Sequence, residues 1–154
     1  MRSLGFTARV CACALTVVSP AAAATIPVPS GGNLHQAILT AQPGDTIVLA
    51  RGAVYTGNFT LSNKGGASRT ITIRTDGDDG LLGAGGRISP ANAGQLAVIR
   101  SGNTAPAIQT APGAHHWTLQ LLEIQANANG VGDIVTLGDG STAQTSLGRF
   151  RTIS

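Results

Sequence analysis

The chain is built from short apolar stretches separated by turns that leave no room for intervening helices, and this feature constrains its fold most strongly. The clearest example is the segment QPGDTIVLARGAVYTGNFTL at residues 42–61. A turn at 43–45 leads into a strand at 46–50, a second turn follows at 51–52, and a second strand is expected at 58–61. Glycine between short β-branched runs is typical of tight turns between strands. We expect an all-β fold in which this segment forms the first coil of a solenoid.

The same pattern recurs with a period typical of repeat proteins. Further strands are predicted at TITIR (70–74), LAVIR (96–100), AIQT (107–110), WTLQLLEI (117–124) and DIVTL (133–137). Ile47 and Ile71 are 24 residues apart, Ile108 and Ile134 are 26 apart, and Ile71 and Leu119 are 48 apart, which we interpret as two coils. Such periods indicate parallel stacking of each strand on its equivalent one coil later. An open β-sandwich is the alternative that the turn signals permit.

Alternation within the strands predicts which side chains face the core. Successive side chains of a strand point to opposite faces, so Ile71 and Ile73 are expected to point inward and their threonine neighbours outward. The expected core positions are Ile47, Leu49, Ile71, Ile73, Leu119 and Leu121.

A short amphipathic helix is predicted ahead of the strands, from Leu34 to Gln42. Asn33 can cap its first turn, and Pro43-Gly44 ends it. Its apolar residues recur at the spacing of one helix face; they are Leu34, Ala37, Ile38 and Ala41. Such a helix would cover the open hydrophobic end of the first coil. His35 lies off this face and is expected to be solvated.

Residues 1–24 have the three parts of a secretory signal peptide. Arg2 and Arg9 give a positive N-terminal region, residues 10–18 form an apolar core, and alanines at 21–24 permit cleavage after Ala24 or one residue earlier. The apolar core is about half of the roughly 20 residues that span a bilayer, so no stable membrane anchor is expected. The mature protein, residues 25–154, is expected to be secreted or periplasmic.

Both cysteines, Cys11 and Cys13, lie inside this leader. The alternatives to their simple removal are a metal or redox role for the C-x-C spacing and lipidation of Cys13. Without the leader the protein has no cysteine, so packing alone must hold it together.

Charged residues are few and scattered. Only 11% of the residues are charged and 3% are aromatic, but 42% are hydrophobic, which argues against disorder. Without Arg2 and Arg9, eight basic residues stand against seven acidic ones, and the basic residues occur singly. This distribution lacks the basic stripe that marks a nucleic-acid interface, so no nucleic-acid partner is expected.

Residues 76–95 (DGDDGLLGAGGRISPANAGQ) break the period and are predicted to form an inserted loop. Loops of this length in compact domains are usually functional or mobile. Three acidic residues could bind Ca²⁺, but the EF-hand pattern fails at its sixth and twelfth positions, and a solvated acidic turn is the other interpretation. These residues are Asp76, Asp78 and Asp79.

The segment APGAHHWTLQLLEI at 111–124 contains the other candidate binding residues. Adjacent strand residues point to opposite faces, so His115 and His116 are not expected to bind one metal ion together. One should face solvent and the other should line the turn. Trp117 could present its face to a sugar ring or fill a corner of the coil, and the sequence leaves both open.

The order of these segments resembles the N-terminal part of right-handed parallel β-helix proteins of the pectin-lyase-like class. The resemblance rests on the helix at 34–41, AQPGDTIVL at 41–49, GAVYTGNFTL at 52–61 and ITIR at 71–74. The later segments APGAHHWTLQLLEI and DIVTLGDGS look like the following coils of secreted bacterial members, so the resemblance covers residues 33–147. It implies a right-handed parallel β-helix with a short N-terminal capping helix.

The class includes polysaccharide lyases, polygalacturonases, epimerases and non-catalytic surface proteins, and fold alone does not choose between them. The lyases and hydrolases of the class use clustered acidic and basic groups that are not matched here. Glu123, Asp133 and Asp139 are isolated, and Asp78-Asp79 lacks partner residues. No catalytic residue, metal ligand or cofactor is therefore assigned, and substrate-binding residues stay unknown.

Two functions follow from the resemblance. The first is the N-terminal part of a secreted polysaccharide-acting enzyme, with its catalytic groups beyond this chain; the alternative is a non-catalytic β-helix that binds surfaces. The end of the chain, Arg149–Ser154, indicates the start of another strand without a capping coil. We therefore expect about four coils, a truncated and inactive chain, and self-association through the last coil.

Overall fold

The computed structural model describes residues 22–65, 68–77, 88, 90–127, 130 and 132–138. These residues form three parallel sheets, together with one short α-helix and one 3-10 helix. The elements in chain order are β1 (Thr25–Val28), α1 (Leu34–Thr40), β2 (Thr46–Leu49), β3 (Val54–Thr56), β4 (Phe59–Leu61), β5 (Ile71–Thr75), η1 (Pro90–Gln95), β6 (Ala97–Arg100), β7 (Ile108–Thr110), β8 (Trp117–Gln120), β9 (Leu122–Ile124) and β10 (Val135–Thr136).

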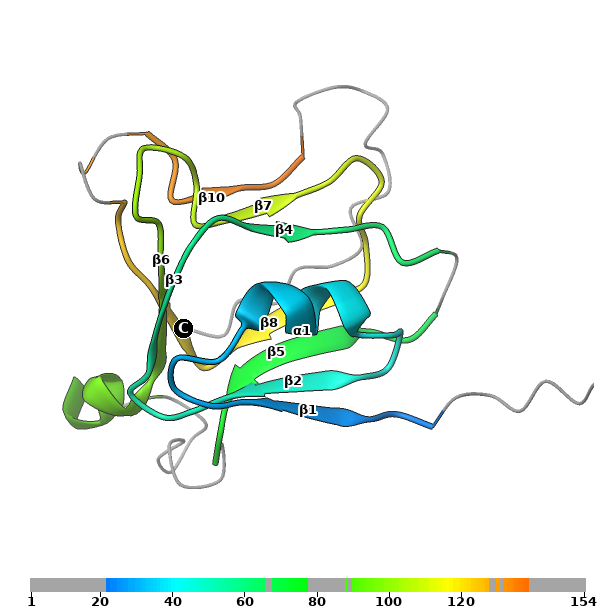
Figure 1. The fold of residues 1–154 in the computed structure, drawn as a ribbon, viewed down its shortest axis with the longest axis horizontal. Coiled ribbons are helices and arrows are strands. Elements are labelled where there is room, and N and C mark those ends of the chain that lie inside the picture. Colours follow the sequence, from blue (N-terminus) through cyan, green and yellow to red (C-terminus); the bar gives the residue numbers. More distant parts are fainter. Residues whose placement is uncertain are drawn as a thin grey trace, which may run out of the picture.

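The strands follow one another around three sides of the molecule. One sheet has the order β1-β2-β5-β8, the second β3-β6-β9 and the third β10-β7-β4, and every pairing is parallel. The described chain therefore passes three times through all three sheets, as β2-β3-β4 (the first coil), β5-β6-β7 (the second coil) and β8-β9-β10 (the third coil). Figure 1 shows β4, β7 and β10 opposite the β1-β2-β5-β8 sheet, with β3 and β6 crossing between them. This is an all-β, solenoid-like fold.

The pairing register differs from the predicted one by two residues. Ile47 pairs with Ile73, not with Ile71, and Ile73 pairs in turn with Leu119. A shift of two residues leaves the side chains of these strands on their predicted faces. Ile108, however, pairs with Val135 and not with Ile134, and Ile134 is exposed. The interval from Ile71 to Leu119 is also one coil rather than two, because it contains the insertion between β5 and β6.

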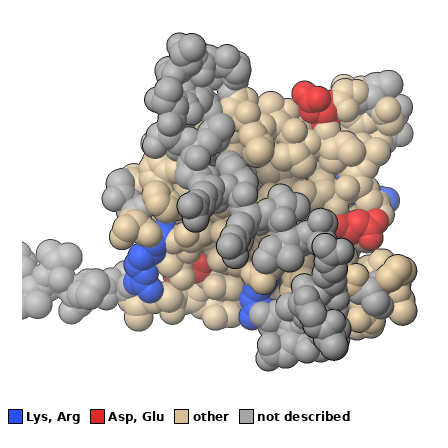
Figure 2. Space-filling model, turned by 180° about the vertical axis from the view of Figure 1, so that it is seen from behind, with Lys and Arg blue, Asp and Glu red and all other residues tan. Residues whose placement is uncertain are grey.

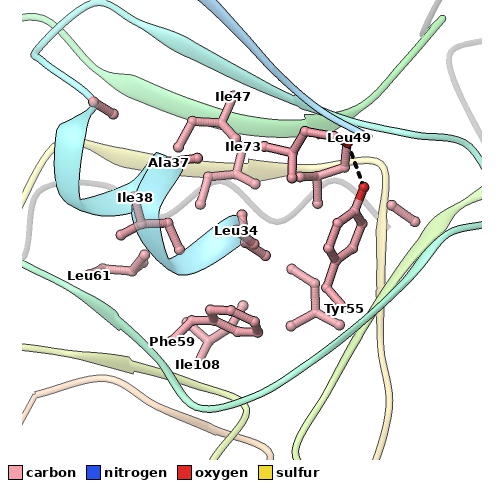
Figure 3. Close-up of a cluster of buried hydrophobic side chains, with 14 of the residues drawn as sticks. Leu34, Ala37, Ile38, Ile47, Leu49, Tyr55, Phe59, Leu61, Ile73 and Ile108 are labelled. Carbon is pink, nitrogen blue, oxygen red and sulfur yellow. Dashed lines mark hydrogen bonds between the residues drawn. The ribbon is translucent and has the colours of Figure 1, made fainter. Parts of the chain in front are cut away.

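The helix α1 covers the end of the first coil, as predicted. The Asn33 side chain accepts a hydrogen bond from the Gln36 amide at 2.9 Å, which satisfies one donor of the first turn. The helix contacts β1 and β4 and ends at Thr40, two residues before the predicted end. Figure 3 shows its apolar side chains, Leu34, Ala37 and Ile38, among inward side chains of the sheets: Ile47, Leu49, Tyr55, Phe59, Leu61, Ile73 and Ile108.

Two predicted core positions differ from expectation. Ile47, Leu49, Ile71 and Ile73 are fully buried, but Leu119 is only partly buried. Leu121 is buried in a separate small cluster with Leu96. The predicted strand 117–124 is divided into β8 and β9 because Leu121 has a φ of 53° and turns the chain from one sheet into the next.

Several other predicted boundaries changed. The strand β3 was not expected, and the lead-in to α1 contains β1. The predicted strand 133–137 shortens to β10, and its flanking residues Ile134 and Leu137 are exposed. Of the predicted insertion 76–95, residues 90–95 form η1, while 78–87 and 89 lie outside the described residues. Residues 1–21 of the predicted leader, with Cys11 and Cys13, also lie outside them. None of the helices in the described ranges is long and apolar enough to cross a membrane.

Candidate functional site

Charge alone does not mark a site on this molecule. Figure 2 shows basic and acidic side chains at a few separate places on the described part of one face, most of which is uncharged. No group of three or more metal-ligating side chains occurs within the described ranges. A candidate site therefore has to be found from the arrangement of polar side chains on the sheets.

The outward face of the β3-β6-β9 sheet carries a polar row across three coils. Tyr55 and Ile99 point into the core, so their neighbours Thr56 and Arg100 point outward. Thr56 pairs with Arg100 in the parallel register. Gln125 follows β9 at the same level, because its amide donates to the Ile99 carbonyl at 3.0 Å. The row Thr56–Arg100–Gln125 thus runs along the solenoid axis.

Arg100 is the exposed cation of this row. Its Nε donates to Thr56 Oγ1 at 3.2 Å, which fixes the side chain across the sheet. A guanidinium has five N–H donors in a planar fork that matches a carboxylate or a pair of oxygens. Within the described residues this is its one side-chain hydrogen bond, so the terminal N–H groups of Arg100 are available to a ligand.

Gln125 and Glu123 extend the polar surface. Gln125 Nε2 donates to Glu123 Oε1 at 2.7 Å, and Glu123 pairs with Val98, which lies two residues before Arg100 in β6. One carboxylate, one guanidinium, one amide and one hydroxyl therefore share a single face of the sheet.

Hydrogen bonds donated by side chains hold the corner beside this row. Asn58 Nδ2 donates to Ser101 Oγ at 2.9 Å and to the Pro106 carbonyl at 2.8 Å. Asn103 Nδ2 donates back to Asn58 Oδ1 at 2.9 Å. From the third coil, Asn127 Nδ2 donates to the Thr104 carbonyl of the second coil at 3.1 Å. These bonds satisfy polar groups at the turns that would be costly to leave unpaired. They give the polar row a rigid border.

Two hollows lie along the row. One, of about 370 Å³, is lined by Asn33, His35, Thr56 and Asn58 among others. The other, of about 330 Å³, is lined by Thr56, Arg100, Ser101, Gly102, Gln125, Ala126 and Asn127. Thr56 lines both hollows, and we call this part of the surface the Thr56–Arg100 groove. It is suited to an elongated ligand rich in hydroxyl or carboxylate oxygens.

The groove offers binding groups but not the pair of acids that glycoside hydrolysis uses. Hydrolases place two carboxyl groups about 5–10 Å apart across the scissile bond. Among the described residues of this face, Glu123 is the carboxylate; Asp133 follows the sheet as an exposed residue, and Asp139 lies outside the described residues.

Trp117 is not part of a binding surface. Its side chain is fully buried, and Nε1 donates to the Ser62 carbonyl at 3.0 Å. Of the two interpretations that the sequence left open, corner packing is confirmed and the sugar platform is wrong. The buried N–H has found the partner that an interior indole needs.

The two histidine side chains were expected to point apart, one to solvent and one to the turn, and this part of the prediction was wrong. His115 Nδ1 and His116 Nδ1 lie 2.5 Å apart, and the rings meet edge to face. Neither residue belongs to β8, and His116 has a φ of 57°, so the strand rule that should separate the two side chains does not apply. With Lys64 and Arg69 they line a very small hollow at the turns into β5 and β8, where burial lowers the pKa of Lys64.

The remaining candidates lie apart from one another. His35 is exposed at the start of α1, as predicted, and lines the larger hollow. Asp76 is exposed at the end of β5, and its backbone carbonyl accepts from Arg51 Nε at 2.9 Å; Asp78 and Asp79 lie outside the described residues. Asp76 belongs to no group of three or more metal-ligating side chains in the described part of the chain.

Sequence reasoning did not single out Thr56, Arg100 or Gln125. Arg100 ends the predicted strand 96–100, and the alternation there would have placed it outward. The juxtaposition with Thr56 depends on pairing between β3 and β6, and β3 itself was missed. No local motif marks three residues that meet only through the stacking of coils.

Comparison with known proteins adds one likeness. No protein-family model and no curated protein matches the chain. A solved structure that is similar to it is an alginate lyase from Paenibacillus sp. str. FPU-7, with a TM-score of 0.50 and 25% sequence identity. The match covers 74% of this chain and 31% of the lyase, so the chain spans less than a third of that protein's length. The similar protein is a polysaccharide lyase, and the parallel sheets described above fit a β-helix-like fold.

Proposed function

We propose that the chain is the N-terminal part of a secreted, polysaccharide-acting protein with a right-handed parallel β-helix of the pectin-lyase-like class. The observation that carries this proposal is the likeness to the alginate lyase over 74% of the chain. Parallel strands joined by crossovers are right-handed in nearly all known cases, which supports the handedness. The Thr56–Arg100 groove is proposed to bind the polysaccharide.

The chemistry of the groove supports an oxygen-rich, acidic ligand. Arg100 can hold a sugar carboxylate with two parallel N–H···O bonds, while Thr56 and Gln125 can bond to hydroxyl groups. Because the three residues stand on adjacent, hydrogen-bonded strands, they are about 4.8 Å apart along the axis. This spacing lets one extended chain contact all three.

A non-catalytic role is the second candidate. The observation that favours it is the single carboxylate, Glu123, among the described residues of the groove face. A protein of this kind would hold a polysaccharide surface without cleaving it.

Binding and cleavage assays on the exported chain test both candidates. Affinity gel electrophoresis with alginate, polygalacturonate and a neutral glucan measures binding, and release of unsaturated or reducing ends measures cleavage. We expect binding to the acidic polymers without cleavage by this chain. Equal retardation by all three polymers, or by none, would remove the basis of the proposal; cleavage would show that catalytic groups lie within these residues.

A pair of variants makes the binding test specific to the groove. Arg100→Ala should weaken binding to acidic polysaccharide about tenfold, because it removes charge-assisted hydrogen bonds. Gln109→Ala is the matched control: Gln109 Nε2 donates to Thr60 Oγ1 at 2.8 Å in the same outward, cross-strand manner, but on the β4-β7-β10 sheet. If both variants bind like the parent chain, the ligand does not occupy the groove.

A further inference from the structure

The carboxylate of Asp45 is buried and bound to the backbone just before the first strand. Its side chain is 6% exposed. Oδ1 accepts from the Ala24 amide at 2.8 Å, and Oδ2 accepts from the Gln42 amide at 2.8 Å. Both of these donors are backbone amides, so the two hydrogen bonds bring no positive charge to the carboxylate. A buried carboxylate is costly unless a positive charge or several donors compensate it.

Ala24 is tied to the turn by a second hydrogen bond. The Thr46 amide donates to the Ala24 carbonyl at 2.8 Å, next to the parallel pairing of Thr25 with Thr46. Ala24 is therefore bonded through both its nitrogen and its oxygen to residues at the start of β2. Losing Ala24 would leave Asp45 Oδ1 and the Thr46 amide without these partners.

The leader offers more than one peptide bond with small residues at the cleavage positions. Cleavage after Ala24 places Ala22 and Ala24 at the −3 and −1 positions, and cleavage after Ala23 places Ala21 and Ala23 there. Both satisfy the small-residue rule for signal peptidase. Cleavage after Ala22 would put Pro20 at −3, which does not.

We infer that the leader is removed by hydrolysis of the Ala23–Ala24 bond and that the new α-ammonium group of Ala24 forms a charge-assisted bond to the buried Asp45 carboxylate. Hydrolysis adds water across the peptide bond, leaving a carboxylate on Ala23 and an ammonium group on Ala24. The same nitrogen that donates as an amide in the continuous chain then carries a positive charge at 2.8 Å from Oδ1. Such a bond is about twice as strong as its neutral counterpart.

This inference rests on the proposal that the protein is secreted, and mass spectrometry separates the two. The full chain is expressed in an exporting bacterial host, and the intact mass of the exported protein is measured. The expected mass is that of residues 24–154. A mass beginning at Thr25 or at another residue of the alanine run overturns the inference but leaves secretion intact; a product that retains Cys11 and Cys13 overturns both.

A stability cycle tests the ion pair without relying on the host's peptidase. Proteins that start at Ala24 and at Thr25 are prepared with native N-termini, each with and without Asp45→Asn. The protein that starts at Ala24 should have a ratio of folded to unfolded molecules on the order of tenfold higher than the protein that starts at Thr25. Asp45→Asn should remove most of that difference. Asp76→Asn, which changes an exposed carboxylate, should preserve it.

The control for nonspecific charge effects is blocking of the amine. Acetylation of the Ala24 nitrogen restores a neutral amide, so the acetylated protein should lose most of the charge-assisted gain while keeping the geometry. Equal urea midpoints for the free and acetylated forms would contradict the ion pair, even if cleavage occurs at Ala23–Ala24.

Discussion

The first and third coils follow the same pattern of inward and outward residues, yet they are buried to different extents. In the first coil Ile47, Leu49 and Leu61 have no exposed surface. In the third coil Trp117 is equally buried, but the inward side chains that follow it are only partly buried: Leu119, Leu122, Ile124 and Val135. Alternation decides which way a side chain points, but not how much water it loses.

The difference lies in what stacks on each coil. The first coil has the second coil on one side and α1 with β1 on the other. In the described part of the chain the third coil has a neighbour on one side only. Apart from Trp117, an inward side chain is therefore fully buried only when other elements cover its coil on both sides along the solenoid axis, as expected for stacked repeats.

The largest expected effect is at the centre of the stack. Ile73 lies between Ile47 and Leu119 in one inward row and is 1% exposed. Ile73→Asp would bury an unpaired charge and should destabilise the fold by more than about 4 kcal/mol. Thr72→Asp, one residue away but outward, should cost about 1 kcal/mol or less. Urea unfolding followed by circular dichroism measures both, and equal midpoints would show that the assigned faces are wrong.

A smaller substitution compares the two coils directly. Ile47→Ala removes a fully buried side chain and should cost about 3 kcal/mol, within the range for core truncations. Leu119→Ala in the same row should cost about 1 kcal/mol, because part of its side chain already contacts water. The two free energies of unfolding show whether the stability contributed by an inward side chain depends on having a neighbouring layer on both sides of its coil. If Leu119→Ala costs as much as Ile47→Ala, the third coil is covered as well as the first.

The sequence predicts the faces of the strands better than their pairing. Apolar alternation correctly placed Ile71 and Ile73 inward because it depends only on the strand period of two. It could not fix the pairing of Ile47 with Ile73, since a shift of two residues conserves the pattern. The division of 117–124 at Leu121 was also hidden, because a leucine with positive φ carries no local signal of a turn.

The candidate groove was less accessible to sequence reasoning than the core. Its residues come from three coils and meet only after the sheets form. The predicted separation of the His115 and His116 side chains was wrong for the opposite reason. A local strand rule was applied to residues that precede the strand. Both cases show that side-chain proximity in a solenoid depends on turn geometry, which short motifs define poorly.

The interior of the first coil also contains a polar group whose ionisation can be followed. Tyr55 Oη donates to the Val28 carbonyl at 2.7 Å and accepts from the Ala50 amide at 3.1 Å. Burial raises the pKa of Tyr55, and the bond from Ala50 offsets part of this rise. Because a raised pKa favours the protonated form in the folded state, its contribution to stability is present below the ordinary pKa of about 10 and is lost as the pH rises through the folded pKa.

Tyr55 is the one tyrosine in the sequence, so ultraviolet absorbance of tyrosinate reports on it alone. We expect its titration midpoint to lie above that of the urea-unfolded chain. Tyr55→Phe should cost about 1–3 kcal/mol by leaving the buried partners unpaired, and it should flatten the loss of stability at alkaline pH. Identical midpoints in the folded and unfolded chains would place the hydroxyl in water rather than in the covered first coil.

The smallest expected effect concerns the cap of α1, the element that distinguishes the first coil from the third. Asn33→Ala removes the acceptor for the Gln36 amide and should cost about 1 kcal/mol in the free energy of unfolding. Asn33→Ser, which keeps a capping oxygen, is the matched control and should restore most of that loss. Because α1 covers the first coil, the loss should be accompanied by faster hydrogen exchange of amides in β2 and β4, whereas β8 and β9 should be unchanged. Equal acceleration in the first and third coils would mean that α1 stabilises the solenoid as a whole, and the difference between the two coils would then need another cause.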